Sequence, residues 1–137
     1  NSSIHSLLSS KYHEAQMYQL NIHAEIPDPV IHSYLTDLDL AVVLGHLMNN
    51  AIDGARKAHE GFISIAYFDE EGCQSFIVES AISDEKALLS MMASQIPING
   101  GDAGINAVQD ILERYPNTSF SVRSQKHKMM QILEMRP

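Results

Sequence analysis

Apolar residues recur along the chain with two spacings, and each spacing predicts one kind of element. From Ser3 to Gln19, from Thr36 to His59 and from Gly104 to Arg114 they return every three or four residues, as in amphipathic helices. A short helix is also expected over 83–94. The apolar stripe of the second helix is the longest and consists of Leu40, Val43, Leu44, Leu47, Met48, Ala51, Ile52 and Ala55.

Alternating apolar residues predict the strands. One strand is expected over 20–26, before Pro27. The segments "FISIAYFD" and "CQSFIVES" flank the turn "DEEG", and "TSFSVRS" and "MMQILEM" flank "QKHK", so two β-hairpins are expected. Hairpins with helices between them favour an α+β fold, a two-layer sandwich in which a mixed, mostly antiparallel sheet carries its helices on one face. The length predicts a single domain over 1–137.

Composition narrows the class of protein. The formal net charge of -8 argues against a nucleic-acid partner, because duplex binders present a basic face. No apolar run approaches the roughly 18 residues of a membrane-spanning segment. The single cysteine, Cys73, favours a reducing compartment. Because the chain begins without Met, we expect it to be a piece of a longer protein.

Two adjacent asparagines interrupt the stripe in "LGHLMNNAIDGARKA", although asparagine is unfavourable inside a helix. His46 and Asn50 are four residues apart and share a face, and Asn49 and Asp53 share a neighbouring one. An amide oxygen is a suitable ligand for Mg²⁺, which prefers hard oxygen donors. The alternative is that both amides are solvated or hydrogen-bonded to a loop.

A glycine-containing loop, "NGGDAG", precedes the predicted helix over 104–114. Glycines there allow the backbone to approach an anion, and the helix N-terminus offers free N–H groups to phosphate. Such strings also occur in ordinary turns. The occurrence of this loop and the asparagine-containing helix in one short chain favours phosphate binding.

Three segments together carry a family resemblance: "LLSSKYHEAQMYQLNIHAEIP", "LGHLMNNAIDGA" and "DAGINAVQDILERYPN". The chain resembles the ATP-binding domain of sensor histidine kinases, whose GHKL or Bergerat fold is shared with gyrase, heat-shock chaperones and mismatch-repair ATPases. Within that group it is most similar to the Agr-type kinases of peptide quorum-sensing receptors. The resemblance covers nearly the whole chain.

The resemblance implies roles for three residues of the second helix, and Lys57 lies one turn beyond the last of them. Asn50 matches the asparagine that coordinates the magnesium ion of the nucleotide. His46 takes a position held by Asn in these kinases and by a catalytic Glu in gyrase-type relatives, so a contact with phosphate or water is expected there. Asp53 matches an acidic position after the asparagine, for which a bound water or a helix cap is as much expected as direct ligation. Lys57 is a candidate phosphate contact or an ordinary surface lysine.

The resemblance also implies nucleotide contacts outside that helix. Gly104 matches a glycine that lets the backbone meet the phosphates, and Gly100, Gly101 and Ile105 belong to the same loop. Ser80 stands where Agr-type kinases carry an Asn that contacts adenine, and it is expected to accept from the adenine amino group directly or through water.

Other positions depart from the family pattern. Asp102 replaces a glycine beside the phosphates, Ala107 replaces a common Asn, and Asn49 replaces an Asp. A carboxylate next to phosphates is repulsive unless a cation lies between them. These departures leave open a second interpretation, in which the chain is a non-catalytic GHKL-fold module that acts through protein contacts.

The first interpretation is a histidine-kinase module that binds ATP and Mg²⁺. It would hold the nucleotide between the helix over 40–58 and the loop over 100–104, with residues 84–98 as a lid. It would present the γ-phosphate to a histidine on a separate dimerisation domain of the same protein, with a response regulator as an indirect partner. None of its seven histidines lies in a motif like the acceptor box of the family. The resemblance implies a cytoplasmic domain of a membrane-anchored receptor.

Overall fold

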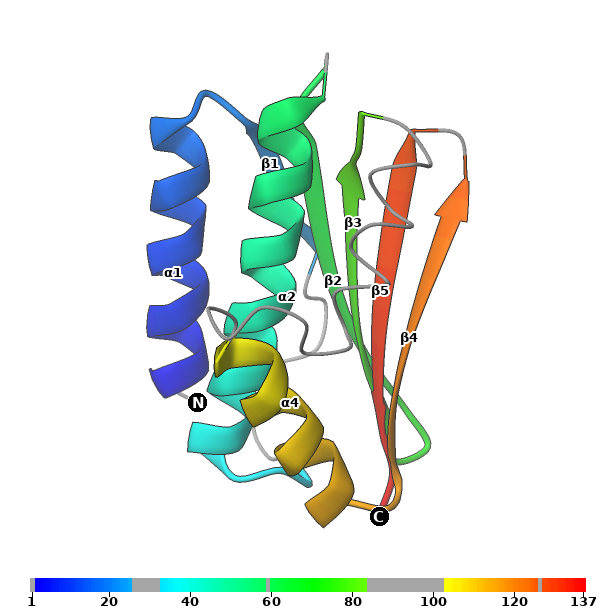
Figure 1. The fold of residues 1–137 in the computed structure, drawn as a ribbon. Coiled ribbons are helices and arrows are strands. Elements are labelled where there is room, and N and C mark those ends of the chain that lie inside the picture. The colour runs from blue at the N-terminus through cyan, green and yellow to red at the C-terminus, as the bar shows by residue number, and fades with distance from the viewer. Residues whose placement is uncertain (1, 26–32, 59, 84–102, 126) are drawn as a thin grey trace.

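A computed structural model describes residues 2–25, 33–58, 60–83, 103–125 and 127–137, of which 2–3 and 103–107 are described by their backbone alone. Helices and strands alternate along the chain much as the hydrophobic pattern predicts (Figure 1). In chain order they are α1 (Ser2–Met17), β1 (Asn21–Glu25), α2 (Asp37–Lys57), β2 (Phe62–Glu70), β3 (Cys73–Ala81), α4 (Ala103–Arg114), β4 (Thr118–Gln125) and β5 (Lys128–Met135).

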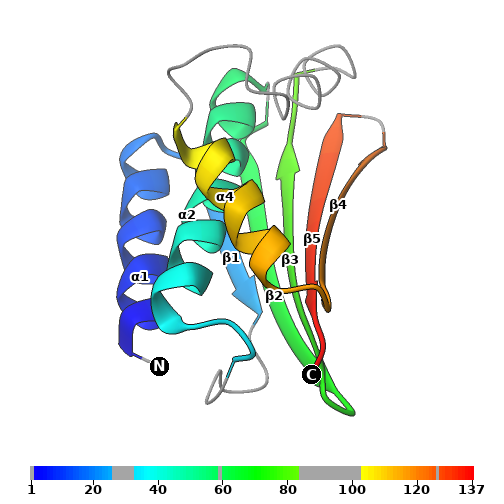
Figure 2. The same ribbon diagram turned by 60° about the horizontal axis from the view of Figure 1, so that its bottom comes forward.

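The strands form one sheet in the order β1-β2-β3-β5-β4. β1 pairs with β2 in parallel, and every other pairing is antiparallel. Helices α1, α2 and α4 lie together on one face of this sheet, which both views show (Figures 1 and 2). The predicted fold class is confirmed: a two-layer α+β sandwich with a mixed, mostly antiparallel sheet.

Helix α2 fills the centre of the helical layer. Its predicted apolar stripe is buried along its whole length against the sheet and the other helices. Thr36 caps the N-terminus, since its side chain accepts from the backbone N–H of Asp39 at 3.2 Å. The helix ends at Lys57, two residues before the predicted end at His59.

The hairpin of β2 and β3 places the end of β3 beside α2. Glu71 and Gly72 form its turn with φ angles of 53° and 86°, so both adopt the left-handed backbone that a two-residue hairpin turn requires. The hydroxyl of Tyr34 donates to the carbonyl of Gly72 at 2.7 Å, which ties this turn to the segment that leads into α2.

A polar cluster joins the beginning of α2 to the end of α4. The buried carboxylate of Asp39 accepts from the hydroxyl of Tyr115 at 2.7 Å and from Nη2 of Arg114 at 3.2 Å. The hydrogen bond from Tyr115 is the main reason that the pKa of Asp39 lies below its ordinary value of 3.8. This cluster fixes the C-terminal end of α4 against α2.

Some predictions concern residues outside the described ranges. The short helix expected over 83–94 lies almost entirely there, as does the lid expected over 84–98. Among the helices of the described ranges, none is long and apolar enough to cross a membrane.

We expect Tyr115→Phe to lower the free energy of unfolding at pH 7 by about 1–2 kcal/mol, because it removes a hydrogen bond to a buried carboxylate. Since the pKa of folded Asp39 is depressed, its contribution to stability is present above pH 3.8 and is lost as the pH falls through the folded pKa. The difference between variant and wild type should therefore shrink in acid. Urea denaturation from pH 7 to pH 3 measures it.

The control is Tyr12→Phe, which removes the hydroxyl of a tyrosine that is 40 % exposed on α1 and should leave stability within about 0.5 kcal/mol of wild type. A loss for Tyr115→Phe that stays constant down to pH 3 would contradict the charge-assisted bond to Asp39.

Candidate functional site

His46 and Asn50 meet on the half-buried side of α2. Nδ2 of Asn50 lies 3.2 Å from Nε2 of His46, as their spacing of four residues predicts. An amide nitrogen can only donate, so in this contact Nε2 of His46 accepts. The face expected from the sequence therefore exists, and its two members are directly hydrogen-bonded.

A third residue, Gln131 of β5, completes the cluster. The same Nδ2 of Asn50 donates to Oε1 of Gln131 at 3.2 Å, and Nε2 of Gln131 donates to the backbone carbonyl of Leu47 at 2.9 Å. Both contacts of Asn50 use its amide nitrogen. Its oxygen Oδ1 takes part in neither of them, and this is the atom that the resemblance assigns to the metal.

The neighbouring Asn49 serves a different contact. Its Oδ1 accepts from Nζ of Lys11 at 2.6 Å, and the same ammonium pairs with Glu14 at 3.2 Å. Lys11 and Glu14 belong to α1, so Asn49 joins α2 to α1 on the side away from the sheet. The two adjacent asparagines therefore have separate contacts, and Asn49 is hydrogen-bonded to a helix, whereas the alternative from the sequence expected solvent or a loop.

Ser80 lies on the helix-facing side of β3 and is completely buried. Its Oγ has no hydrogen-bond partner among the residues that the structure describes. A buried hydroxyl without a partner costs about 1–3 kcal/mol, so such atoms are typically paired with water or a bound group. The hydroxyl of Ser80 is therefore suited to receive a ligand.

Two contacts of α2 with the sheet bracket Ser80. On one side Leu47 lies over Gln131, whose partner in β3 stands two residues before Ser80. On the other side Gly54 approaches β3 so closely that a Cβ there would lie 3.2 Å from the carbonyl oxygen of Ala81. Ser80 thus lies between the contacts that Leu47 and Gly54 make with the sheet. Asn50, the predicted metal ligand, belongs to the same part of α2.

The remaining predicted residues are more scattered. Asp53 and Lys57 are exposed on α2, and among the described residues no hydrogen bond or ion pair joins either of them to the cluster of His46 and Asn50. Gly104 lies in the first turn of α4, followed by Ile105, so their backbone N–H groups belong to the unpaired N-terminal donors of that helix. Gly100 and Gly101 lie outside the described residues.

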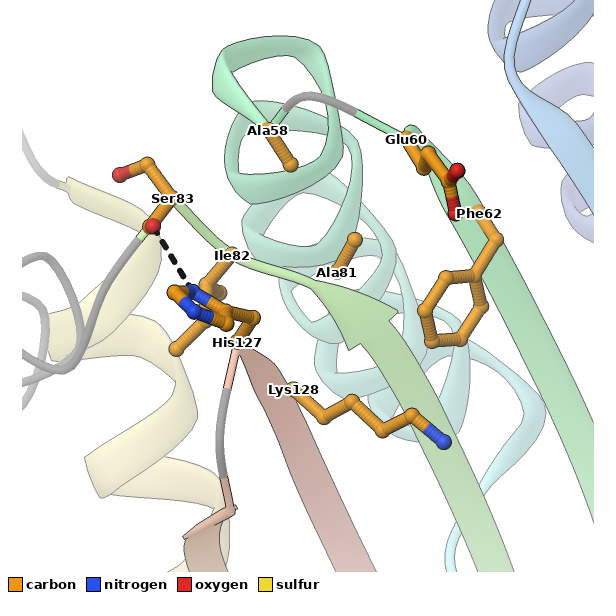
Figure 3. A pocket seen from close by; sticks show the side chains of 8 residues that line it. All are labelled: Ala58, Glu60, Phe62, Ala81, Ile82, Ser83, His127 and Lys128. Atoms are coloured by element: carbon orange, nitrogen blue, oxygen red, sulfur yellow. Dashed lines mark hydrogen bonds between the residues drawn. The ribbon is translucent and has the colours of Figure 1, made fainter.

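A pocket of about 380 Å³ opens beyond the C-terminal ends of α2 and β3 (Figure 3). On one side of it His127 lies next to Ser83, and Nδ1 of His127 donates to the carbonyl oxygen of Ser83 at 3.1 Å. None of the residues predicted from the sequence lines it, although Ala81, which follows Ser80, does. Its lining consists of Ala58, Glu60, Phe62, Ala81, Ile82, Ser83, His127 and Lys128.

Sequence reasoning missed Gln131. A signal was present, because Met129, Gln131, Leu133 and Met135 share one face of the predicted strand and only Gln131 among them is polar. A single amide at an inward position of an apolar strand is expensive unless it is hydrogen-bonded, and so it indicates a specific partner. The sequence does not reveal that the partner is Asn50.

The fold is that of the catalytic domains of histidine kinases. The catalytic domain of histidine kinase ThkA, in a nucleotide-free form, aligns with a TM-score of 0.79 at 14 % identity over 99 % of this chain and 90 % of that one. The Acinetobacter baumannii histidine kinase AdeS gives 0.69 at 16 % identity over 98 % and 63 %. The histidine kinase domain of the Erythrobacter litoralis blue-light activated histidine kinase gives 0.68 at 14 % identity over 93 % and 59 %.

The model of the GHKL domain family matches residues 35–136, and the chain therefore belongs to this family. Among curated proteins, no sequence matches the chain significantly. The matched range contains α2, β3 and β5, which carry Asn50, Ser80 and Gln131.

We expect Ser80→Ala to leave the nucleotide-free chain as stable as wild type, or more stable by up to about 1 kcal/mol, because it removes a buried hydroxyl that has no partner among the described residues. Urea denaturation without nucleotide measures this. Ser75→Ala, at a half-buried position on the opposite face of β3, is the control. A loss of more than 1 kcal/mol for Ser80→Ala alone would reveal a hydrogen bond of Ser80 within the protein.

Proposed function

We propose that this chain is the ATP-binding catalytic domain of a sensor histidine kinase, which holds Mg-ATP and presents its γ-phosphate to a histidine on a separate dimerisation domain. The observation that carries the proposal is the orientation of Asn50. Its amide nitrogen is engaged by His46 and Gln131, which leaves Oδ1 for a cation.

The donor set fits the group that the family implies. Mg²⁺ selects hard oxygen ligands and completes its octahedron with water and phosphate oxygens, so one amide oxygen from the protein is a sufficient beginning. The buried hydroxyl of Ser80 fits the edge of a base, because it can both donate and accept. The backbone donors in the first turn of α4 suit phosphate oxygens.

The proposed roles follow from these positions. Asn50 would hold the metal ion and Ser80 the adenine, while Gly104 and Ile105 would present their N–H groups to the phosphates. His46 would contact phosphate or its water, and Gly100 and Gly101 would shape the approach to α4. Bound Mg²⁺ would supply neutralisation of the phosphate charge, which is the main need of phosphoryl transfer. Asp53 and Lys57 would act at the rim of the site.

We also propose the setting of the domain. The three sequence segments that resemble Agr-type kinases support a place in a peptide quorum-sensing receptor, with this domain in the cytoplasm and the parent protein anchored in the membrane. The dimerisation domain of the same protein would then be its direct partner, and a response regulator would receive the phosphoryl group afterwards.

We expect wild type to bind Mg-ADP and Mg-ATP in calorimetric titration and Asn50→Ala to lose at least tenfold in affinity, because the alanine removes the metal ligand. At a nucleotide concentration of about 100 times the dissociation constant, binding should stabilise wild type by about 2.7 kcal/mol. A thermal melt with and without nucleotide measures the same effect independently.

The matched control is Asn49→Ala, which changes the adjacent asparagine and removes only its contact with Lys11. It should bind Mg-nucleotide as wild type does. If several millimolar nucleotide produces neither heat nor a shift of the melt in wild type, the proposal of a working nucleotide site is wrong. The chain would then fit the alternative of a non-catalytic GHKL module that works through protein contacts.

A further inference from the structure

Gln131 occupies a position that ordinary packing would give to an apolar residue. It is 1 % exposed on the helix-facing side of β5, between Met129 and Leu133, which are also buried. Burying an amide among such neighbours is unfavourable unless its donors and acceptor are paired. Gln131 pairs on both sides, with the carbonyl of Leu47 and with Asn50.

The carbonyl of Leu47 determines the orientation of the whole chain of amides. A carbonyl oxygen only accepts, so Gln131 must turn its nitrogen toward Leu47, and its oxygen then faces Asn50. That oxygen also only accepts, so the hydrogen bond from Asn50 must be donated by its Nδ2. The reversed amide of Asn50 would set two oxygens against each other at the 3.2 Å that now separates donor from acceptor.

We propose that Gln131 is a positioning residue for the metal ligand. Its hydrogen bond to the Leu47 carbonyl fixes the orientation of its own amide, and its oxygen then holds Nδ2 of Asn50, so that Oδ1 of Asn50 stays directed at the cation. The inference rests on the proposed function, because it assigns Oδ1 to Mg²⁺. Gln131 itself touches neither metal nor nucleotide in this account. Residues that orient a ligand in this way typically change metal affinity by 10–100-fold when they are replaced.

Gln131→Met tests the inference because methionine fills a similar volume but offers Asn50 only a weak thioether acceptor and offers the Leu47 carbonyl no donor. Dissociation constants for ADP are measured by calorimetry on the full chain, once with Mg²⁺ and once with EDTA. We expect Gln131→Met to lose about tenfold in affinity with Mg²⁺ and to equal wild type in EDTA. Leu133→Met is the matched control, a methionine at the next inward position of the same strand, and should match wild type in both buffers.

A double-mutant cycle shows whether Gln131 acts through Asn50. In the Asn50→Ala background, Gln131→Met should cause no further loss of Mg²⁺-dependent affinity, because the ligand that it orients is gone. Melting curves of each variant confirm folding, and Gln131→Leu takes the place of Gln131→Met if the methionine variant does not fold.

The outcomes separate the two proposals. If wild type binds ADP no better with Mg²⁺ than with EDTA, the proposed function fails and this inference fails with it. If Asn50→Ala loses the Mg²⁺-dependent affinity and Gln131→Met retains it, the inference alone is overturned. Equal weakening of Gln131→Met with and without Mg²⁺ would also overturn it, since that result reports a purely structural role.

Discussion

The carbonyl oxygen of Leu47 accepts a hydrogen bond from Gln131 at 2.9 Å, and this contact ties the central helix to the sheet at the level of the candidate site. Most of α2 meets the sheet through apolar side chains. These contacts fix the distance between the helix and the sheet, but they do not determine how the polar side chains of the helix are oriented. The hydrogen bond between Gln131 and Leu47 fixes the orientation of the Gln131 amide, because only its nitrogen can donate to a carbonyl oxygen. Asn50 therefore donates to Gln131 through Nδ2, and its Oδ1 is not used in that contact.

The same helix carries its other contacts on separate sides. Asn49 binds Lys11 of α1, and Thr36 caps the N-terminus. Asp39 joins α2 to the end of α4 through Tyr115. The two adjacent asparagines, which look like a flaw in an amphipathic helix, are thus explained by two different neighbours. Helix α2 is therefore held on several sides, by Asn49 against α1, by Asp39 against the end of α4 and by Asn50 against β5.

Much of the fold could be predicted from the sequence, because burial imposes a period on each element. The stripe of α2 and the turn at Glu71 and Gly72 are local patterns, and the structure has them where the pattern places them. The parallel pairing of β1 with β2 and the position of β5 between β3 and β4 are long-range properties that periodicity does not specify. The candidate site could likewise be predicted only in part. The contact of His46 with Asn50 follows from helical spacing, whereas Gln131 is 81 positions away from Asn50 in the chain, and no local pattern predicts their contact. Gly100 and Gly101 lie outside the described residues, so their assignment stays a prediction.

A crystal structure of the chain with Mg²⁺ and a non-hydrolysable triphosphate tests the central claim most directly. The account predicts Oδ1 of Asn50 at about 2.1 Å from the metal ion, with Nδ2 still donating to Gln131 and the hydroxyl of Ser80 within hydrogen-bond distance of the base or of a water on it. A metal ion held by other residues, or an Asn50 whose oxygen faces Gln131 while the nucleotide is bound, would contradict it.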